Sequence, residues 1–175
     1  TWIEAQNKYT QSMLASLPGR ERLRKRINEL RRIDAMWPPR ERNGRYFFEK
    51  RLASQEQFVI YMRQGLKGED QVLIDPHPMS PDHASEVSLM AVSKDGTLIA
   101  YLLVRQGAEY ETTLRIFQVD TRADLPDLLP PRGAYLSVSF KPDNSGFYYT
   151  RHETTGSRVY YHALGSDPAK DPELF

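Results

Sequence analysis

The sequence of 175 residues contains no cysteine, which excludes disulfides and thiolate chemistry. It has no apolar run close to the roughly 20 residues that a membrane-spanning helix needs. Its 24 Lys and Arg residues nearly balance its 23 Asp and Glu residues, so the formal net charge is +1. A chain with so little excess charge does not attract nucleic acid or anionic lipid through its overall field. We therefore expect neither nucleic acid nor a membrane among its partners.

Three patterns that carry enzyme chemistry are also missing from the sequence. The Gly-x-Ser-x-Gly turn, which presents the nucleophile of α/β-hydrolases, does not occur. Neither a Gly-rich phosphate loop nor a His-Glu-x-x-His metal motif is present. The sequence therefore predicts no catalytic residue in this chain, no metal site and no cofactor.

The N-terminal end carries no visible targeting signal. The chain begins at Thr1 rather than at Met, and no signal peptide follows. We interpret this as a sequence whose native N-terminus lies further upstream. The expected location is the cytoplasm, and an upstream targeting segment would change it to the periplasm.

The first part of the chain has a helical pattern and an excess of positive charge. Residues 1–36 hold eight Lys or Arg against four Asp or Glu, a net of +4, and the remaining residues carry −3. A first helix is expected before the break at Pro18-Gly19, and a second between that break and Pro38-Pro39. The second has apolar residues at three- and four-residue steps, as one buried face requires: Leu23, Ile27, Leu30, Ile33 and Trp37.

After Pro39 the apolar period changes from 3.6 to 2, which predicts strands. A glycine followed by a short apolar-aromatic strand occurs three times, at Gly44, Gly96 and Gly146, which are 52 and 50 residues apart. A repeat of this length built from short strands is typical of β-propeller blades. We therefore predict an all-β fold with a helical N-terminal segment, residues 1–37. Residues 38–175 form a partial β-propeller of about three four-stranded antiparallel blades.

The expected strands sort into three blades along the chain. Thr97–Arg105 is almost continuously apolar, which indicates a strand buried on both faces between neighbouring blades. The strands expected from the pattern are Arg45–Glu49, Gln57–Arg63, Gln71–Ile74, Val87–Ser93, Thr97–Arg105, Thr112–Asp120, Asp124–Leu129, Ala134–Phe140, Phe147–Arg151 and Arg158–Leu164.

The four histidines do not form a recognisable ligand set. His77 and His83 share a loop with Asp75 and Asp82, which could be drawn as a metal site, but their spacing matches no zinc or calcium pattern. The prolines of that loop favour a polar surface segment. We interpret the other two histidines, His152 and His162, as cross-strand or edge residues.

Two further sets of residues admit a structural and a functional interpretation. The basic run of the second helix could be a nucleic-acid face, but no aromatic residue is interleaved with it, which favours the solvated side of an amphipathic helix. The aromatic strand residues could form a sugar- or peptide-binding surface, although aromatic strands more often build blade cores. The aromatic residues concerned are Tyr46, Phe47, Phe48, Tyr148, Tyr149, Tyr160 and Tyr161.

Several segments, in order along the chain, resemble the prolyl oligopeptidases, a family of serine peptidases. Each segment is weakly specific, and their shared order and spacing carry the resemblance. They are Trp2-Ile3-Glu4-Ala5-Gln6-Asn7, Gly44-Arg45-Tyr46-Phe47-Phe48, Gly65-Leu66-Lys67-Gly68-Glu69, Val72-Leu73-Ile74-Asp75-Pro76, Val92-Ser93-Lys94-Asp95-Gly96, Asp124-Leu125-Pro126-Asp127 and Tyr160-Tyr161-His162-Ala163-Leu164-Gly165-Ser166-Asp167.

The resemblance implies an N-terminal fragment of a two-domain serine endopeptidase that cleaves short peptides after proline. In such enzymes a propeller restricts access to a C-terminal α/β-hydrolase domain, and the helical segment packs against that domain. The catalytic triad lies in the hydrolase domain, so the resemblance places no catalytic residue in this chain, which is expected to be inactive alone. The implied partners are short proline-containing peptides and the missing hydrolase domain.

The resemblance also gives one candidate substrate-facing residue. Tyr135, within Gly133–Ser137, stands where the family tends to have a substrate-facing aromatic, and the alternative is an inner-strand core residue. Two other functions remain open: an enzyme like oligopeptidase B, which cleaves after Arg or Lys, and a non-enzymatic propeller binding module. A third blade that ends near Phe175 leaves a sheet face and edge unpaired, so we expect the fragment to self-associate through open blades.

Overall fold

The structure is a computed structural model of the chain, and it describes residues 1–81, 84–105, 112–129 and 134–175. The chain divides into two compact units. Residues 1–34 with 52–54 form unit 1, and residues 35–51 with 55–175 form unit 2.

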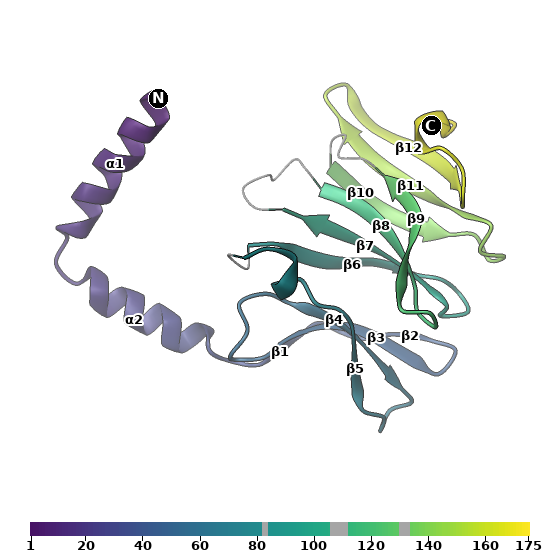
Figure 1. The fold of residues 1–175 in the computed structure, drawn as a ribbon, viewed down its shortest axis with the longest axis horizontal. Coiled ribbons are helices and arrows are strands. Elements are labelled where there is room, and N and C mark those ends of the chain that lie inside the picture. The colour runs from purple at the N-terminus through teal and green to yellow at the C-terminus, as the bar shows by residue number, and fades with distance from the viewer. Residues whose placement is uncertain (82–83, 106–111, 130–133) are drawn as a thin grey trace. The chain divides into compact units, whose positions relative to one another are not determined.

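Unit 1 consists of the two helices expected from the sequence, α1 (Trp2–Ala15) and α2 (Arg20–Arg31) (Figure 1). Thr1 and Glu4 form a capping box that satisfies backbone donors at the start of α1. The two helices are separated by a short turn that ends at Gly19, whose φ of +88° suits a residue without a β-carbon.

Two expectations about the second helix are wrong. No residue of α2 is buried, and Leu23, Ile27 and Leu30 are all more than half exposed. The helix ends at Arg31 rather than at Trp37, because Ala35–Met36 instead pairs with a later strand as β1. The apolar period therefore continues past the point where the backbone leaves the helix.

The first blade of unit 2 has strands β1 (Ala35–Met36), β2 (Arg40–Arg42), β3 (Arg45–Arg51), β4 (Val59–Gln64) and β5 (Asp70–Ile74). Their order is β1-β3-β4-β5, and β2 pairs with another part of β3 beside β1. All pairings are antiparallel. β1 and β2 were not predicted from the sequence, because they are short and largely exposed.

The second blade has strands β6 (Glu86–Val92), β7 (Leu98–Val104), β8 (Thr112–Gln118) and β9 (Ala123–Leu129), paired in chain order. A short 3-10 turn, His77–Met79, precedes it. Five of the seven residues of β7 are buried, which confirms the prediction of a strand covered on both faces.

The third blade has strands β10 (Ala134–Phe140), β11 (Gly146–Glu153) and β12 (Gly156–Ala163), again in chain order. After the 3-10 turn Pro168–Lys170, the chain returns along β12. Residues 172–175 make three backbone hydrogen bonds to β12, at 2.7 to 3.2 Å. These residues occupy the position of a fourth strand. The edge of β12 is therefore paired, and the expectation of an unpaired edge is wrong.

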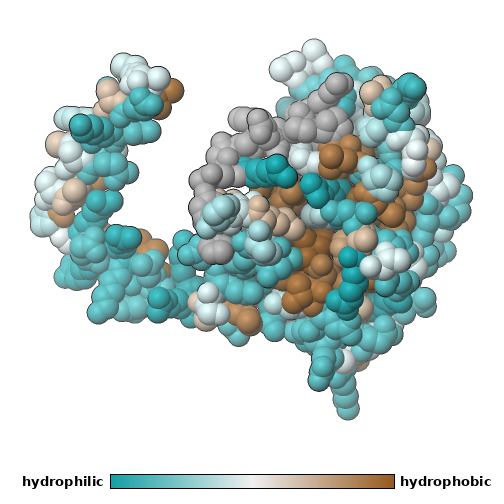
Figure 2. Space-filling model, viewed as in Figure 1, coloured by the Kyte–Doolittle hydropathy of each residue, from teal (hydrophilic) through white to brown (hydrophobic). Residues whose placement is uncertain are grey.

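The hydrophobic core lies between the blades. One cluster joins Phe47, Ile60 and Met62 of the first blade to Leu89, Ile99 and neighbours of the second. Another joins the opposite face of the second blade to Phe147, Tyr149 and Tyr160 of the third. On the face shown in Figure 2, hydrophobic residues gather in the middle of unit 2 and hydrophilic residues surround them. Blades packed face to face in chain order match the predicted fold class, a partial propeller with a helical start.

Among the residues that the structure places, no helix is long and apolar enough to cross a membrane.

Candidate functional site

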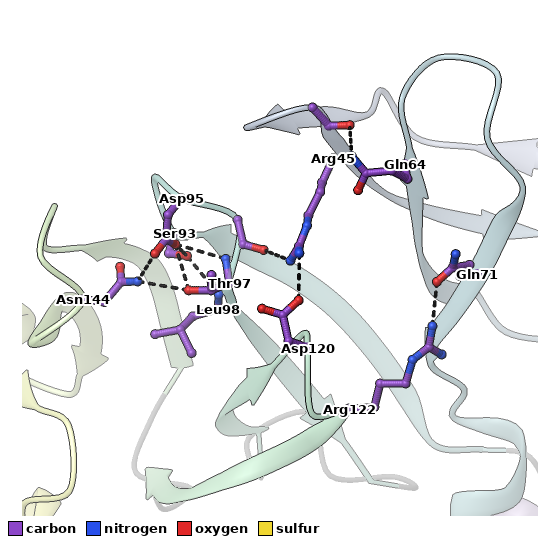
Figure 3. Close-up of polar contacts among 12 residues, drawn as sticks. Arg45, Gln64, Gln71, Ser93, Asp95, Thr97, Leu98, Asp120, Arg122 and Asn144 are labelled. Atoms are coloured by element: carbon purple, nitrogen blue, oxygen red, sulfur yellow. Dashed lines mark hydrogen bonds and ion pairs between the residues drawn. The ribbon is translucent and has the colours of Figure 1, made fainter.

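Polar contacts between blades gather around the turn that joins β6 to β7 (Figure 3). Its central residue is Asp95. One carboxylate oxygen of Asp95 accepts hydrogen bonds from the Ser93 hydroxyl at 2.7 Å and from the Thr97 amide and hydroxyl at 3.0 and 2.9 Å. The other oxygen accepts from the Asn144 amide of the third blade at 2.7 Å. Asp95 thus organises its own turn and binds the next blade.

These hydrogen bonds stabilise the charged form of Asp95. Partial burial alone would raise the pKa of its carboxyl, but the donors from Ser93, Asn144 and Thr97 outweigh that effect and hold the pKa well below its usual range. The equivalent turn of the third blade behaves similarly, since hydrogen bonds from Ser145 and Lys141 lower the pKa of Asp143 to about 2.

Arginines connect the first and second blades on the same side of unit 2. The Arg45 guanidinium forms an ion pair with Asp120 at 2.8 Å and donates to the Gly96 carbonyl at 3.1 Å (Figure 3). In the opposite direction, Arg122 donates to the Gln71 side chain at 2.6 Å and to the Val72 carbonyl at 3.1 Å. The turns therefore link consecutive blades by polar contacts at their rims, while the apolar cores fill the space between them.

A second polar cluster is buried between the second and third blades. His162 of β12 is fully buried, and its ring nitrogens lie 3.0 Å from a carboxylate oxygen of Asp127 and 2.9 Å from one of Asp171. Both carboxylates are almost fully buried as well. Each ring nitrogen of His162 therefore has its own carboxylate partner. Tyr149 donates to Asp171 at 2.9 Å and completes the cluster.

The loop histidine His77 has both ring nitrogens engaged by protein groups. Its Nδ1 lies 2.6 Å from Asp75, and its Nε2 accepts a hydrogen bond from the Gln57 amide at 3.3 Å. The other two members of the candidate set, Asp82 and His83, lie outside the described residues. Within the described part of the chain, no group of three or more metal-ligating side chains is brought together.

The remaining histidine is part of a surface hairpin. His152 lies opposite Ser157 in the pairing of β11 with β12, with 3.2 Å between the ring Nδ1 and the hydroxyl. This confirms the interpretation of His152 as a cross-strand residue. A hydrolytic triad also needs a carboxylate that orients the histidine, and the contact described between His152 and Ser157 includes none. The contact between His152 and Ser157 can stabilise the hairpin.

The sequence-predicted residues are distributed over several parts of the structure. Tyr135 lies in β10, opposite Arg151, next to an irregularity in the pairing with β11, and its side chain is outside the described residues. Phe47, Phe48, Tyr149 and Tyr160 are buried, which favours their interpretation as core, whereas Tyr148 is 40% exposed.

The basic run occupies α2, where Arg24 and Arg26 pair with acidic residues on the same helix. These pairs fit the interpretation of a solvated helical side.

The inner strands of the three blades surround an open cavity of about 630 Å³. Its lining comes from β2, β6 and β10 and from the turns that follow β2 and β6. Arg40 of β2 reaches across to the Met90 carbonyl of β6 at 2.6 Å, so the cavity wall is continuous between the first two blades.

The sequence profile of the family described as "Prolyl oligopeptidase, N-terminal beta-propeller domain" matches residues 1–175. The chain belongs to the prolyl oligopeptidase family. It is 25% identical to a prolyl endopeptidase of Elizabethkingia meningoseptica over 185 aligned residues, covering 97% of this chain and 25% of that relative.

Solved structures agree with this assignment. One from a study of two prolyl endopeptidases is 33% identical, has a TM-score of 0.87, and covers 98% of this chain and 27% of its own length. Oligopeptidase B from Leishmania major shares the fold, with 18% identity, a TM-score of 0.74, and coverage of 99% and 26%.

Family membership confirms the resemblance seen in the sequence. The chain spans about a quarter of the length of these relatives and corresponds to the N-terminal propeller region of a serine peptidase. From the sequence, the aspartate turns were predicted only as turns. The contact of Asn144 with Asp95 joins residues 49 positions apart, and a repeated Asp beside a residue with positive φ, Gly96 or Asn144, is the signal that could have indicated it.

Proposed function

We propose that this chain is the first part of the propeller of a serine endopeptidase that cleaves short peptides on the carboxyl side of proline. The observation that carries the proposal is the family match over all of residues 1–175, together with 33% identity and a TM-score of 0.87 to a prolyl endopeptidase structure. Two curated relatives that each align with 97% of this chain are both prolyl endopeptidases.

In this proposal the chemistry belongs to a hydrolase domain outside residues 1–175. A serine there attacks the peptide, a histidine acts as general base, and backbone donors stabilise the oxyanion of the acyl-enzyme pathway. The propeller contributes by restricting the active site to short peptides. The polar contacts at Asp95 and Arg45 support that role, because they connect three consecutive blades of the wall.

We further propose that the helices of unit 1 dock on the hydrolase domain. Several of their apolar side chains, including Ile3, Leu23 and Ile27, are more than half exposed. Exposed apolar stripes of this kind mark protein contact sites. Tyr135 remains a candidate substrate-facing residue of the same enzyme.

Two assays test the proposal. The 175-residue chain and the full-length gene product are each incubated with a chromogenic peptide that releases its dye after proline, and with a matched peptide that has arginine in place of proline. We expect cleavage of the prolyl peptide by the full-length protein only. Activity of the 175-residue chain alone would refute the assignment of the catalytic groups to another domain.

The same assays separate the two alternatives. Preferential cleavage after arginine would indicate an enzyme like oligopeptidase B, whose solved structure shares only 18% identity with this chain. No cleavage of either peptide by a folded full-length protein would favour a propeller binding module. Substituting Tyr135 by Ala in the full-length protein should raise KM for the prolyl peptide several-fold with little change in kcat, if the residue faces substrate.

A further inference from the structure

The cavity between the inner strands has an uncompensated positive charge. Among the described residues that line it, Arg40, Arg42 and Lys94 are basic and Glu41 is acidic. A Glu41 carboxylate oxygen is engaged by the Gly44 amide at 2.6 Å. The cavity therefore presents more cationic than anionic groups to any molecule that enters.

The three cations are engaged to different degrees. Arg40 donates to the Met90 carbonyl and lies near Glu49. Burial raises the pKa of Glu49, and the Leu89 amide and the charge of Arg40 offset part of that effect. Arg42 donates only to the Glu41 carbonyl, and no ion pair found in the described part of the chain includes Arg42 or Lys94. Two full positive charges thus remain available at the cavity.

The rest of the cavity lining combines polar groups, among them Asn43, with a smaller amount of apolar surface. Ala91 and Val92 are buried, each 8% exposed, and Val138 and Phe140 are half-buried. Ser139 adds an exposed hydroxyl. Lys94 stands between Ser93 and Asp95, whose turn Figure 3 shows held by hydrogen bonds, so its backbone has a fixed position at the cavity. The volume of about 630 Å³ lies within the range of small-ligand sites.

We propose that this cavity binds the free C-terminal carboxylate of short peptides that end in an apolar residue. The carboxylate matches Arg42 and Lys94, since guanidinium and ammonium groups are the usual partners of carboxylates. The apolar side chain contacts the half-buried Val138 and Phe140. Binding here requires no hydrolase domain, so the inference goes beyond the proposed peptidase activity and can fail without affecting it.

The test is a titration of the isotope-labelled 175-residue chain, followed by amide NMR shifts. The probes are N-acetyl-Gly-Phe with a free carboxylate and the same dipeptide as its C-terminal amide. We expect the acid to shift the amides of Val92, Ser139 and Phe140 in a saturable way. The amide should bind at least about fivefold more weakly, because it lacks the charge that Arg42 and Lys94 recognise.

Variants identify the groups responsible. Arg42→Gln and Lys94→Gln should each weaken binding of the acid about threefold to fivefold and reduce its dependence on salt. Lys67→Gln is the matched control, since Lys67 is an exposed lysine outside the cavity lining. A thermal melt of each variant shows that the fold is retained.

Three results would overturn the inference: equal affinity for the acid and the amide, an equal effect of Lys67→Gln and Lys94→Gln, or no saturable shift with the unmodified chain. Each would leave the peptidase assays of the full-length protein unchanged.

Discussion

At the scale of single residues, the structure depends on polar groups that the sequence pattern does not distinguish. His162 looked like one of several strand histidines, and the prediction of a cross-strand or edge position missed its burial. Its partner Asp127 lies 35 residues earlier, in the outer strand of the previous blade. Only the packing of one blade on another brings the two together, so no local pattern could have predicted the cluster.

Replacing His162 tests the cluster directly. His162→Leu removes the imidazole that contacts two almost fully buried carboxylates. A buried polar group that loses a hydrogen-bond partner costs about 1–3 kcal/mol and two carboxylates lose one here, so we expect the free energy of unfolding in urea to fall by about 3 kcal/mol. His152→Leu is the control, because His152 is exposed. It should change the unfolding free energy by less than about 0.5 kcal/mol. Equal losses in the two variants would contradict the assigned role.

The contribution of the Asp95 carboxyl to the free energy of unfolding should depend on pH. Its pKa is lowered in the folded state, so its contribution to stability is complete above the unfolded value near 3.8 and disappears as the pH falls toward the folded value. At pH 7, Asp95→Asn should lower the free energy of unfolding by about 1 kcal/mol, a modest figure because the side chain is exposed. The difference from the unmodified chain should shrink as the pH falls below about 4.

Urea unfolding at several pH values measures that difference. Glu56→Gln is the control, because it also replaces a carboxylate by an amide, at an exposed position. It should leave the stability unchanged within about 0.5 kcal/mol at each pH. A constant Asp95→Asn penalty from pH 7 to pH 2 would show that the charge of Asp95 is not what stabilises the turn.

At the scale of elements, the strands could be predicted well where alternation was strong. Ala134–Phe140 has the bounds expected, and most other strands differ by one or two residues. The misses have physical causes. Arg40–Arg42 is charged and exposed throughout, so β2 has no apolar alternation, and its pairing with β3 comes from the turn at Asn43 and Gly44. The second helix was predicted to end too late, because Ile33 and Trp37 continue the apolar spacing of α2 by coincidence.

The turn at Gly96 shows how closely neighbouring blades approach. Gly96 has a φ of +71°, and a β-carbon there would lie 3.0 Å from the Arg42 carbonyl oxygen of the first blade. Gly65 has a similar φ of +66° but open space around it. Alanine at either glycine must adopt a left-handed backbone, which costs about 1–2 kcal/mol. Only Gly96→Ala also places a methyl group too close to the neighbouring blade.

We therefore expect Gly96→Ala to reduce the free energy of unfolding by at least about 1 kcal/mol more than Gly65→Ala, because the two blades must separate to admit the methyl group. Urea denaturation followed by circular dichroism measures both. A cost for Gly65→Ala equal to that for Gly96→Ala would mean that the blades tolerate the added carbon without shifting.

At the scale of the whole molecule, the two end blades of unit 2 differ. The outward aromatic pair of the first blade, Phe48 and Tyr61, is buried under Arg63 and Lys50, which also bind Asp70. On the third blade, Tyr148 and Tyr161 pair at 5.3 Å on the face away from the second blade, and Tyr148 remains 40% exposed. The open surface is therefore the face of the third blade.

Self-association through that face is the expected consequence. Contact between this face and the same face of a second chain gives a two-fold symmetric dimer, because the surface then meets itself. Static light scattering of the 175-residue chain should give a mass above 20.3 kDa that rises with concentration toward twice that value. Tyr148→Lys should restore a monomer, since it brings a second cation beside Lys141. Tyr9→Lys, at an exposed tyrosine of α1, should leave the association unchanged. A constant monomer mass at high concentration would rule out this surface as an interface.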